Sequence, residues 1–525
     1  MRVPETQTAM STVLDEVALE GPELASLLST SARVEQEEPI VLALDVGTSG
    51  VRALLVDGRG DEITGSRTTL ASDLYPTLRG GADTDAAALV ELTTHAIDIL
   101  VERASDIVTR IDYVATSCFW HSLLGVDDHN RPITPLLGWA DTRAANFAEE
   151  LRTKFDERAV HRRTGCRFHP SYWPAKLLWL QHQRGGLFEK TKRWVSFADY
   201  LAERLFGETA TSVSMASATG LFDQHECEWD HELLKVLGLP ADHLATVAQP
   251  GKLFRALRDE YASRWPLLDR AAWFPAIGDG AANNIGAGCL TRDHAVLMVG
   301  TSGAMRSAFS GNPPASLPPE LFCYRVDRNR VVIGGALSDG GGLYRWMKET
   351  LELDQLDDEL EREIGALEPD AHGLTILPFW SGERSTGWAT SARGMIAGLT
   401  SQTKPIEILR AAMEAVCYRF ALLARALKKT APETSIIASG NALLSSHTWS
   451  QMIADVFGQR IELSTVKEAS CRGAALLALE AIGKIGNLEN AGAQTDEVFE
   501  PDMKRHEAYS RAIERQQELY ERLVK

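Results

Sequence analysis

The 525-residue sequence has few cysteines, no long apolar run and a shortage of positive charge. Its seven cysteines are scattered, without a Cys-x-x-Cys pair or a metal-ligand spacing, which favours reduced cytoplasmic thiols over a disulfide scaffold or a zinc site. No segment approaches about 18 consecutive apolar residues, so we expect no membrane span. The 54 basic and 72 acidic residues give a net charge of −18, and no basic stripe suited to nucleic acid is visible.

Three widespread signatures are also missing. The sequence contains no Gly-x-x-x-x-Gly-Lys-Ser/Thr loop, no strand-linked Gly-x-Gly-x-x-Gly and no Gly-x-Ser-x-Gly turn. These absences argue against P-loop, Rossmann-type and α/β-hydrolase sites. What is present is an ordinary globular composition with 44% apolar residues. The length predicts two domains, because single cores seldom exceed about 300 residues.

One pentapeptide, Val-Gly-Thr-Ser-Gly, occurs twice, at Val46–Gly50 and at Val299–Gly303. Each copy follows a short apolar run, so each is predicted to form a turn after a strand. Glycine, threonine and serine leave backbone N–H groups and hydroxyls open to an anion. One such turn would be an ordinary hairpin. Two identical turns predict two related halves that bind one polyphosphate between them.

Strand-like and helix-like segments alternate along the chain, which predicts the α/β class. Residues 1–38 are acidic and carry no targeting pattern, and we expect a flexible leader there with one short helix over Thr12–Leu28. Strands are predicted over 40–46, 51–56, 63–69, 113–117, 331–333 and 435–438. Helices are predicted over 86–105, 146–155, 174–183, 197–206, 343–351, 447–457 and 470–482, the last rich in small residues and suited to close packing.

Two aspartates beside these turns are candidates for chemistry. Asp45 ends an otherwise apolar strand, where a carboxylate is costly unless it is paired, and it is suited to hold Mg²⁺ through water. Asp279 lies in Gly278-Asp279-Gly280, a common hairpin turn, but the following Ala-Ala-Asn-Asn-Ile-Gly favours a helix. At a helix N-terminus its carboxylate would be held ionised, ready to accept a hydroxyl proton in phosphoryl transfer.

Together these motifs resemble the FGGY carbohydrate kinases, from about residue 40 to about residue 485. The resemblance implies ATP and Mg²⁺ and the actin/hexokinase/Hsp70 ATPase fold, with two ribonuclease-H-like domains around a central cleft. It implies a sugar-binding domain over 39–288, which contains the phosphate-1 loop and the catalytic Asp279, and an ATP-binding domain over 289–525. The implied cofactor contacts are Gly47, Thr48 and Ser49 (phosphate-1), Gly300, Thr301, Ser302 and Gly303 (phosphate-2), Gly341, and Gly440, Asn441 and Ser445 (adenosine loop), with Asp45 toward the metal.

The adenosine loop departs from the family pattern at one position. The family usually has Gly-Gly-Ala, whereas this chain has Gly440-Asn441-Ala442. Asparagine tolerates a positive φ better than most residues, so we expect the turn to survive.

Within the family, several stretches are most similar to gluconate kinases, among them His161–Gly165, Ala216–Gly220 and Phe322–Tyr324. Phosphorylation of D-gluconate to 6-phosphogluconate is therefore the favoured reaction, and xylulose or another ketopentose or polyol is the alternative substrate. The resemblance implies a sugar site formed by Trp120, His121, Asp141, His169, Asp279 and Arg384.

The carboxylate of gluconate needs a cation or a helix N-terminus, and Arg384, His169 and His121 are the candidates. Three of the sugar-site residues also have structural interpretations. His121 fits a core histidine, Asp141 fits a helix N-cap, and Arg384 fits a salt-bridge partner near Glu383.

Two other functional classes stay open at this point. A non-catalytic sugar and nucleotide sensor would not need to retain Asp45, both turns and Asp279. An actin- or Hsp70-like ATPase would not need the Trp-His and Trp-Ala-Asp motifs around His121 and Asp141. The expected partners are a small sugar or sugar acid and ATP, without nucleic acid or membrane, and a homodimer is left open.

Overall fold

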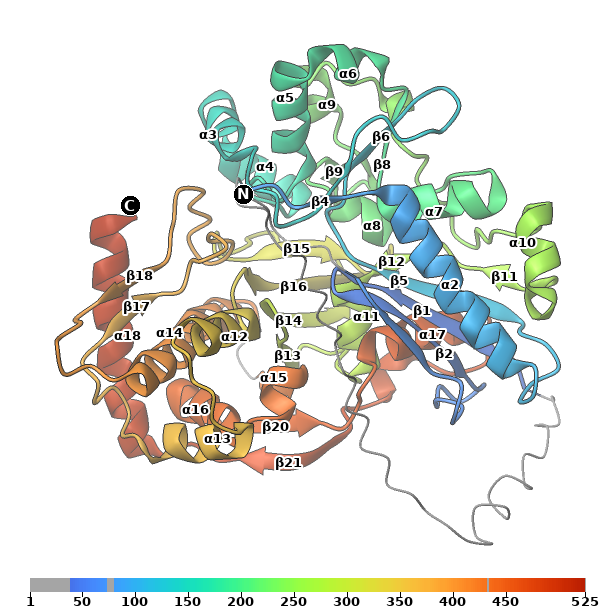
Figure 1. The fold of residues 1–525 in the computed structure, drawn as a ribbon. Coiled ribbons are helices and arrows are strands. Elements are labelled where there is room, and N and C mark those ends of the chain that lie inside the picture. The colour runs from blue at the N-terminus through green and yellow to red at the C-terminus, as the bar shows by residue number, and fades with distance from the viewer. Residues whose placement is uncertain (1–37, 73–79, 432–433, 525) are drawn as a thin grey trace, which may run out of the picture.

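The computed structural model describes residues 38–72, 80–431 and 434–524, which form two lobes (Figure 1). The helix predicted over Thr12–Leu28 lies outside the described residues. In the part of the chain that is described, no helix combines the length and the apolarity that a membrane crossing needs. All seven cysteines are buried and unpaired, as their spacing predicts.

The first lobe is built on a sheet ordered β11-β5-β1-β2-β3, with β12 also paired to β5. β1 pairs antiparallel with β2 and β2 with β3, whereas β5 runs parallel to β1, and β11 and β12 run parallel to β5 (Figure 1). The strands are β1 (Val41–Val46), β2 (Gly50–Val56), β3 (Thr68–Ala71), β5 (Tyr113–Cys118), β11 (Ala272–Trp273) and β12 (Ile277–Gly278).

The second lobe repeats this plan in the order β15-β16-β14-β13-β19-β20-β21. Its β16, β14 and β13 are antiparallel neighbours, and β19 and β20 continue parallel to β13, as β5 does beside β1. The repeated order confirms the two related halves predicted from the duplicated pentapeptide. The strands are β13 (His294–Val299), β14 (Gly303–Ser310), β15 (Phe322–Arg325), β16 (Arg330–Leu337), β19 (Ser435–Ser439), β20 (Ile461–Ser464) and β21 (Thr495–Phe499).

Most predicted helices form within two residues of their expected bounds, and α7 and α16 match them at both ends. α7 shows why: the Ser196 hydroxyl caps its first turn in a capping box with Asp199, and Gly207 ends it in the left-handed conformation. The helices are α2 (Ala86–Ala104), α3 (Ala145–Lys154), α4 (Glu157–Thr164), α5 (Trp173–Gln183), α6 (Gly185–Lys190), α7 (Phe197–Phe206), α8 (Val213–Ser217), α9 (His231–Val236), α10 (Asp259–Arg264), α11 (Asp279–Gly286), α12 (Gly341–Thr350), α13 (Asp357–Ala366), α14 (Pro405–Leu427), α15 (Asn441–Leu444), α16 (His447–Phe457), α17 (Ala469–Ala481) and α18 (Met503–Leu523).

The strand predicted over 63–69 is wrong in its first part. Gly65 has a φ of 84°, and the Ser66 hydroxyl donates to the Ile63 carbonyl at 2.7 Å. These residues therefore turn the chain, and β3 begins only at Thr68.

Helices α11 and α17 pack together at the centre of the molecule, between the two sheets (Figure 1). A Cβ added at Gly286 would lie 1.8 Å from the Ala469 carbonyl oxygen, and one added at Gly473 would lie 1.8 Å from that of Ala282. The other side of α17 covers the first sheet, where Cys471 and its alanines join the buried cluster of Val41. Helix α17, which comes from the second half of the chain, therefore completes the core of the first lobe.

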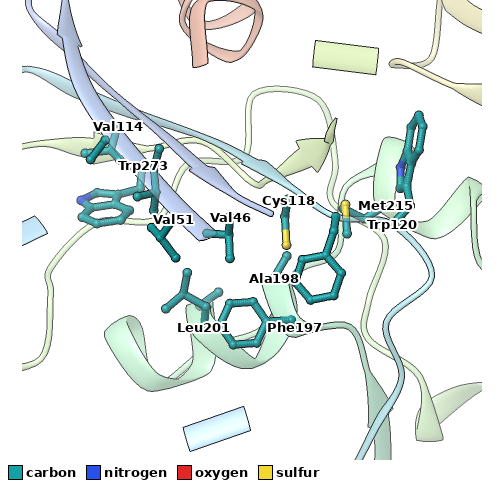
Figure 2. Close-up of a cluster of buried hydrophobic side chains, with 14 of the residues drawn as sticks. Val46, Val51, Val114, Cys118, Trp120, Phe197, Ala198, Leu201, Met215 and Trp273 are labelled. Carbon is teal, nitrogen blue, oxygen red and sulfur yellow. The ribbon is translucent and has the colours of Figure 1, made fainter. Parts of the chain in front are cut away.

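The opposite face of the first sheet is covered by an aromatic and aliphatic core (Figure 2). Trp273 and Val114 lie at one end of this cluster, and Trp120 lies at the other end, beyond Cys118 and Met215. The core thus anchors Trp120 where β5 ends, which is the edge of the sheet that carries the candidate site.

Candidate active site

Strand register places the two candidate aspartates at one edge of the first sheet. Asp45 on β1 lies opposite Ser117 on β5, and Ser117 lies opposite Ile277 on β12. β12 ends at Gly278 and leads directly into Asp279, the first residue of α11. Because β1, β5 and β12 are parallel, their carboxyl ends meet at this edge, which is the usual place for a site in such folds.

Asp45 is only 6% exposed and has two polar partners. The Ser117 hydroxyl donates to its Oδ1 at 2.8 Å, and Arg52 Nη1 donates to its Oδ2 at 3.3 Å. Burial raises the pKa of Asp45 to about 6, against the lowering effects of Ser117 and Arg52, and the nearby Asp279 raises it further. Two mutually repelling carboxylates with hard oxygen donors fit a water-coordinated Mg²⁺.

Asp279 begins α11, and its Oδ1 accepts the N–H of Gly280 at 2.8 Å. Burial raises the pKa of Asp279, while the positive charges of Arg306 and Arg384 and the Gly280 N–H oppose that rise. The helix N-terminus predicted from the sequence is therefore present. Burial has a larger effect on this pKa than the opposing charges and hydrogen bonds, and the ionisation of Asp279 expected from the sequence stays a prediction. A raised pKa makes the carboxylate a stronger base.

Each pentapeptide turn leaves backbone donors open. Gly47 N–H closes the first turn onto Gly50 at 2.9 Å, and Gly300 N–H closes the second onto Ser302 at 2.9 Å. Among the described residues, no hydrogen bond of the structure uses the N–H groups at the two turn centres, which belong to Thr48, Ser49, Thr301 and Ser302. Such open N–H groups are suited to phosphate oxygens.

The second turn meets two more of the predicted nucleotide elements. Gly341, the first residue of α12, donates its N–H to the Gly300 carbonyl at 2.7 Å, and a Cβ added there would lie 3.2 Å from Ala442. A Cβ added at Gly440 would lie 2.5 Å from the Val299 carbonyl oxygen. The structure therefore brings phosphate-2, Gly341 and the adenosine loop together.

The adenosine loop turns at Gly440 and not at Asn441. Gly440 has a φ of 88°, whereas Asn441 opens α15. The turn therefore survives as expected, but through the positive φ of Gly440 and not through a positive φ of Asn441. The Ser445 hydroxyl donates to the Asn441 carbonyl at 2.5 Å, so it closes its own short helix.

Trp120 lies directly beside Asp279, and His121 follows Trp120 in the chain. A Cβ added at Gly278 would lie 1.7 Å from the Trp120 indole nitrogen, so the indole packs against the backbone that carries Asp279. His121 has a φ of 70°, and its Nδ1–H donates to the Ala218 carbonyl at 2.7 Å. Burial lowers the pKa of His121 well below its usual range, with Arg384 contributing. The neutral ring therefore keeps Nε2 as an acceptor.

Asp141 is buried at a turn, with both carboxylate oxygens engaged. It accepts from the Arg143 backbone N–H at 3.0 Å, from the Ala82 N–H at 3.3 Å and from the Arg143 side chain at 2.5 Å. The helix that follows is capped at Ala144, so the N-cap interpretation is wrong. The sugar contact proposed for Asp141 stays a prediction.

His169 is held on both sides of its ring. Its Nε2–H donates to the Glu383 carbonyl at 2.9 Å, and its Nδ1 lies 3.0 Å from the Ser171 hydroxyl. Burial lowers the pKa of His169 to about 3. A neutral histidine is a poor partner for a carboxylate, so Arg384 is the strongest of the three predicted cations.

Arg384 is buried without a carboxylate partner. Its guanidinium lies 4.9 Å from the ring centre of Trp139, and its Nη2 lies 3.5 Å from His121 Nε2. Glu383 pairs with Arg419 instead, and no carboxylate of the described residues forms an ion pair with Arg384. The salt-bridge interpretation is therefore wrong, and the Nε atom of Arg384 has no hydrogen-bond partner.

Four side chains of this region were not predicted from the sequence. Tyr324 contacts Trp120 with ring centres 4.9 Å apart, and its hydroxyl lies 2.6 Å from that of Tyr172. Lys176 is 1% exposed and donates only to the His121 and Ser171 carbonyls, and burial lowers its pKa to about 7. Arg306, on β14, has buried nitrogens without partners. The sequence signal that could have indicated Arg306 is its position three residues after the second pentapeptide.

The fold and the paired turns define the class of the protein. This is the two-domain α/β fold of the actin/hexokinase/Hsp70 ATPase type. A gluconate kinase and a ligand-bound xylulose kinase, both from Lactobacillus acidophilus, match it with TM-scores of 0.83 and 27% identity. The matches cover 93% of this chain and 99% of the first structure, and 92% and 98% for the second.

Sequence comparisons give the family. The N-terminal domain of the FGGY family of carbohydrate kinases matches residues 40–286, and its C-terminal domain matches residues 295–482. The gluconokinase of Bacillus subtilis (strain 168) is 27% identical over 461 residues, 86% of this chain and 89% of that protein. The xylulose kinase of Escherichia coli (strain K12) is 27% identical over 498 residues, covering 92% and 99%.

The chain therefore belongs to the FGGY family of carbohydrate kinases, as its motifs predict. It is a carbohydrate kinase, and kinases of this family use ATP as the phosphate donor.

Proposed function

We propose that this kinase phosphorylates a sugar acid, D-gluconate, at its terminal hydroxyl to give 6-phosphogluconate. The observation that carries this proposal is Arg384, a buried cation beside His121 without an ion-pair partner among the described residues. A neutral ketose or polyol would leave that guanidinium without an ion-pair partner, at a cost. A carboxylate would supply the missing partner through a charge-assisted hydrogen bond. The similarity to gluconate kinases supports the same substrate.

In this proposal the residues of the site have separate roles toward the acceptor, the nucleotide and the metal. Asp279 orients the terminal hydroxyl and accepts its proton, while Trp120 forms an apolar wall beside it. The open N–H groups of the two pentapeptide turns hold the ATP phosphates, and Gly341 and Gly440 allow the nucleotide to approach the backbone. Mg²⁺, held through water near Asp45, would neutralise charge on the phosphates.

The direct test is an ADP-release assay with D-gluconate, D-xylulose, D-ribulose, glycerol and buffer alone. We expect gluconate to give the highest kcat/KM. A preference for xylulose would replace gluconate by the ketopentose alternative. Nucleotide binding without turnover of any acceptor would favour the non-catalytic sensor, and sugar-independent turnover would favour a plain ATPase.

A further inference from the structure

Arg306 is a second buried arginine near Asp279 that the roles given above leave unused. It lies on β14 and is 8% exposed, and its Nε and Nη1 atoms are buried without hydrogen-bond partners. In the described part of the chain, no carboxylate lies within the 4.0 Å of an ion pair with it. An unpaired buried guanidinium is costly, which points to a ligand that is anionic.

The strand turns Arg306 toward the first lobe. Its alternate neighbours Ala304 and Ala308 belong to the buried cluster of the first lobe, whereas Met305 belongs to the core of the second. A Cβ added at Gly280, the residue after Asp279, would lie 2.8 Å from the Arg306 guanidinium carbon. The same Cβ would lie 2.5 Å from the Trp120 ring. Arg306 and Trp120 therefore border the same small region beside Asp279.

Arg384 also lies near this region, because its Nη2 is 3.5 Å from Nε2 of His121, whose ring centre is 6.3 Å from that of Trp120. Burial lowers the pKa of Arg306, and the charge of Arg384 lowers it further, against the opposing charge of Asp279. Both guanidiniums also act on Asp279. Neither guanidinium forms an ion pair with Asp279 or with another carboxylate of the described residues, and an anion bound to both would relieve the repulsion between them.

We propose that Arg306 and Arg384 together hold the carboxylate of the acceptor, which makes Arg306 a specificity-determining residue for sugar acids. This inference rests on the proposed function. The alternative ligand for Arg306 is a phosphate group of ATP. The position of Arg306 argues against a phosphate ligand, because Arg306 lies three residues beyond the second turn, about 10 Å along β14. Its neighbour Trp120 belongs to the predicted sugar site.

The test measures binding of each ligand separately by calorimetry, D-gluconate without nucleotide and ADP without sugar. For Arg306→Gln we expect gluconate to bind at least about 30-fold more weakly, because a buried partner of its carboxylate is lost. ADP affinity should stay within twofold of the wild type. Arg511→Gln, at an exposed position on α18, removes the same charge elsewhere and should change neither affinity.

Arg306→Lys keeps the charge but loses the planar fork, and we expect about tenfold weaker gluconate binding. If the glutamine variant does not fold, the lysine variant alone tests whether Arg306 binds the carboxylate of the acceptor. Unchanged gluconate affinity in the lysine or glutamine variant, with wild-type protein that binds gluconate, would overturn the inference alone. A matching loss of ADP affinity would also overturn it, by assigning Arg306 to the phosphates. Wild-type protein that binds no gluconate would overturn the proposed function together with the inference.

Discussion

At the scale of single residues, the candidate site contains two carboxylates whose burial works against stability when they are ionised. Asp45 lies near the end of β1 and Asp279 directly follows β12, the two strands that pair with β5, and burial raises the pKa of both. Each is therefore more costly to keep ionised in the free protein than in the unfolded chain. Cost of this kind is typical of functional sites, where a protein gives up stability to hold reactive groups.

The first prediction concerns Asp279. Asp279→Asn should fold as the wild type does, because the amide oxygen can still accept the Gly280 N–H, but it cannot accept the hydroxyl proton. We expect kcat to fall by about 10²–10⁴-fold. Steady-state kinetics and thermal unfolding would check this, with Asp354→Asn at an exposed position as the control. Near-normal turnover would remove Asp279 from the mechanism.

The second prediction concerns the pH dependence of stability at Asp45. Its pKa is about 6 in the folded protein against 3.8 for the free side chain, so the folded state binds the proton more tightly. The resulting advantage of the folded state is fully present below about pH 4 and is lost as pH rises through about 6. Asp45→Asn should therefore stabilise the metal-free protein by about 1–3 kcal/mol at pH 8 and by little at pH 4.

Chemical denaturation in EDTA at both pH values would measure this difference. The same variant should lose Mg²⁺-dependent turnover, which assays at pH 8 would show. A stabilisation of equal size at pH 4 and pH 8 would contradict the assignment of the effect to ionisation of Asp45. In the wild type, we expect activity to decline as pH falls through about 6, because the protonated carboxyl no longer attracts the hydrated metal.

At the scale of elements, the position of Asp279 depends on the contact between α11 and α17. This contact is so close that glycine is needed on both helices, at Gly286 and at Gly473. Each glycine faces a backbone carbonyl of the other helix, which cannot move aside as a flexible side chain could. Asp279, the proposed base, is thus held by a close helix pair that joins the two halves of the chain.

The third prediction tests this pair. Gly473→Ala would place a Cβ 1.8 Å from the Ala282 carbonyl oxygen, so we expect a loss of about 1–3 kcal/mol in the free energy of unfolding. Because α11 must shift, kcat should fall as well. Gly186→Ala is the matched control: Gly186 lies in helix α6, with nothing within 4 Å of an added Cβ, and should be neutral or slightly stabilising. Equal stability of the two variants would contradict this account.

At the scale of the whole molecule, the predicted sugar site is assembled from segments far apart in the chain. Glu383, next to Arg384, accepts hydrogen bonds from Arg419 on α14 at 2.5 Å and from the Tyr520 hydroxyl on α18 at 2.6 Å. Its carbonyl accepts from His169 of the first lobe at 2.9 Å. The C-terminal helix therefore contributes to where Arg384 lies, although none of its residues belongs to the predicted sugar site.

The fourth prediction assigns a positioning role to Tyr520. Tyr520→Phe should raise the KM for the acceptor by about 3–10-fold through the loss of one buried hydrogen bond of about 1 kcal/mol, and should leave the KM for ATP unchanged. Tyr509→Phe on the same helix is the control. It loses a hydrogen bond to Glu414 and should cost stability without changing either KM. Equal changes in both variants would indicate a purely structural role for Tyr520.

Local pattern was enough to predict most elements and the donor side of the site. Apolar runs predicted β1, β2 and β5, and capping and glycine signals predicted helices such as α7 and α16. The strand predicted over 63–69 failed at Ser66, whose side chain competes with strand pairing. Its hydroxyl donates to the Ile63 carbonyl and accepts the N–H of Leu55, and the second of these bonds depends on a separate segment of the chain. The N-cap interpretation of Asp141 failed for a similar reason, because its partners come from two separate segments.

The amino-acid sequence by itself determined the duplicated turns and the two-domain class, and it predicted roles for Asp45 and Asp279, because all of these depend on short motifs that recur in the family. Only the tertiary structure decided the acceptor side. His121 and His169 become neutral through burial, Arg384 lacks an ion-pair partner among the described residues, and Arg306 of the other sheet packs against Gly280, the residue after Asp279. Burial and pairing are properties of the packed molecule, since the partners of a charge are set by segments hundreds of residues away.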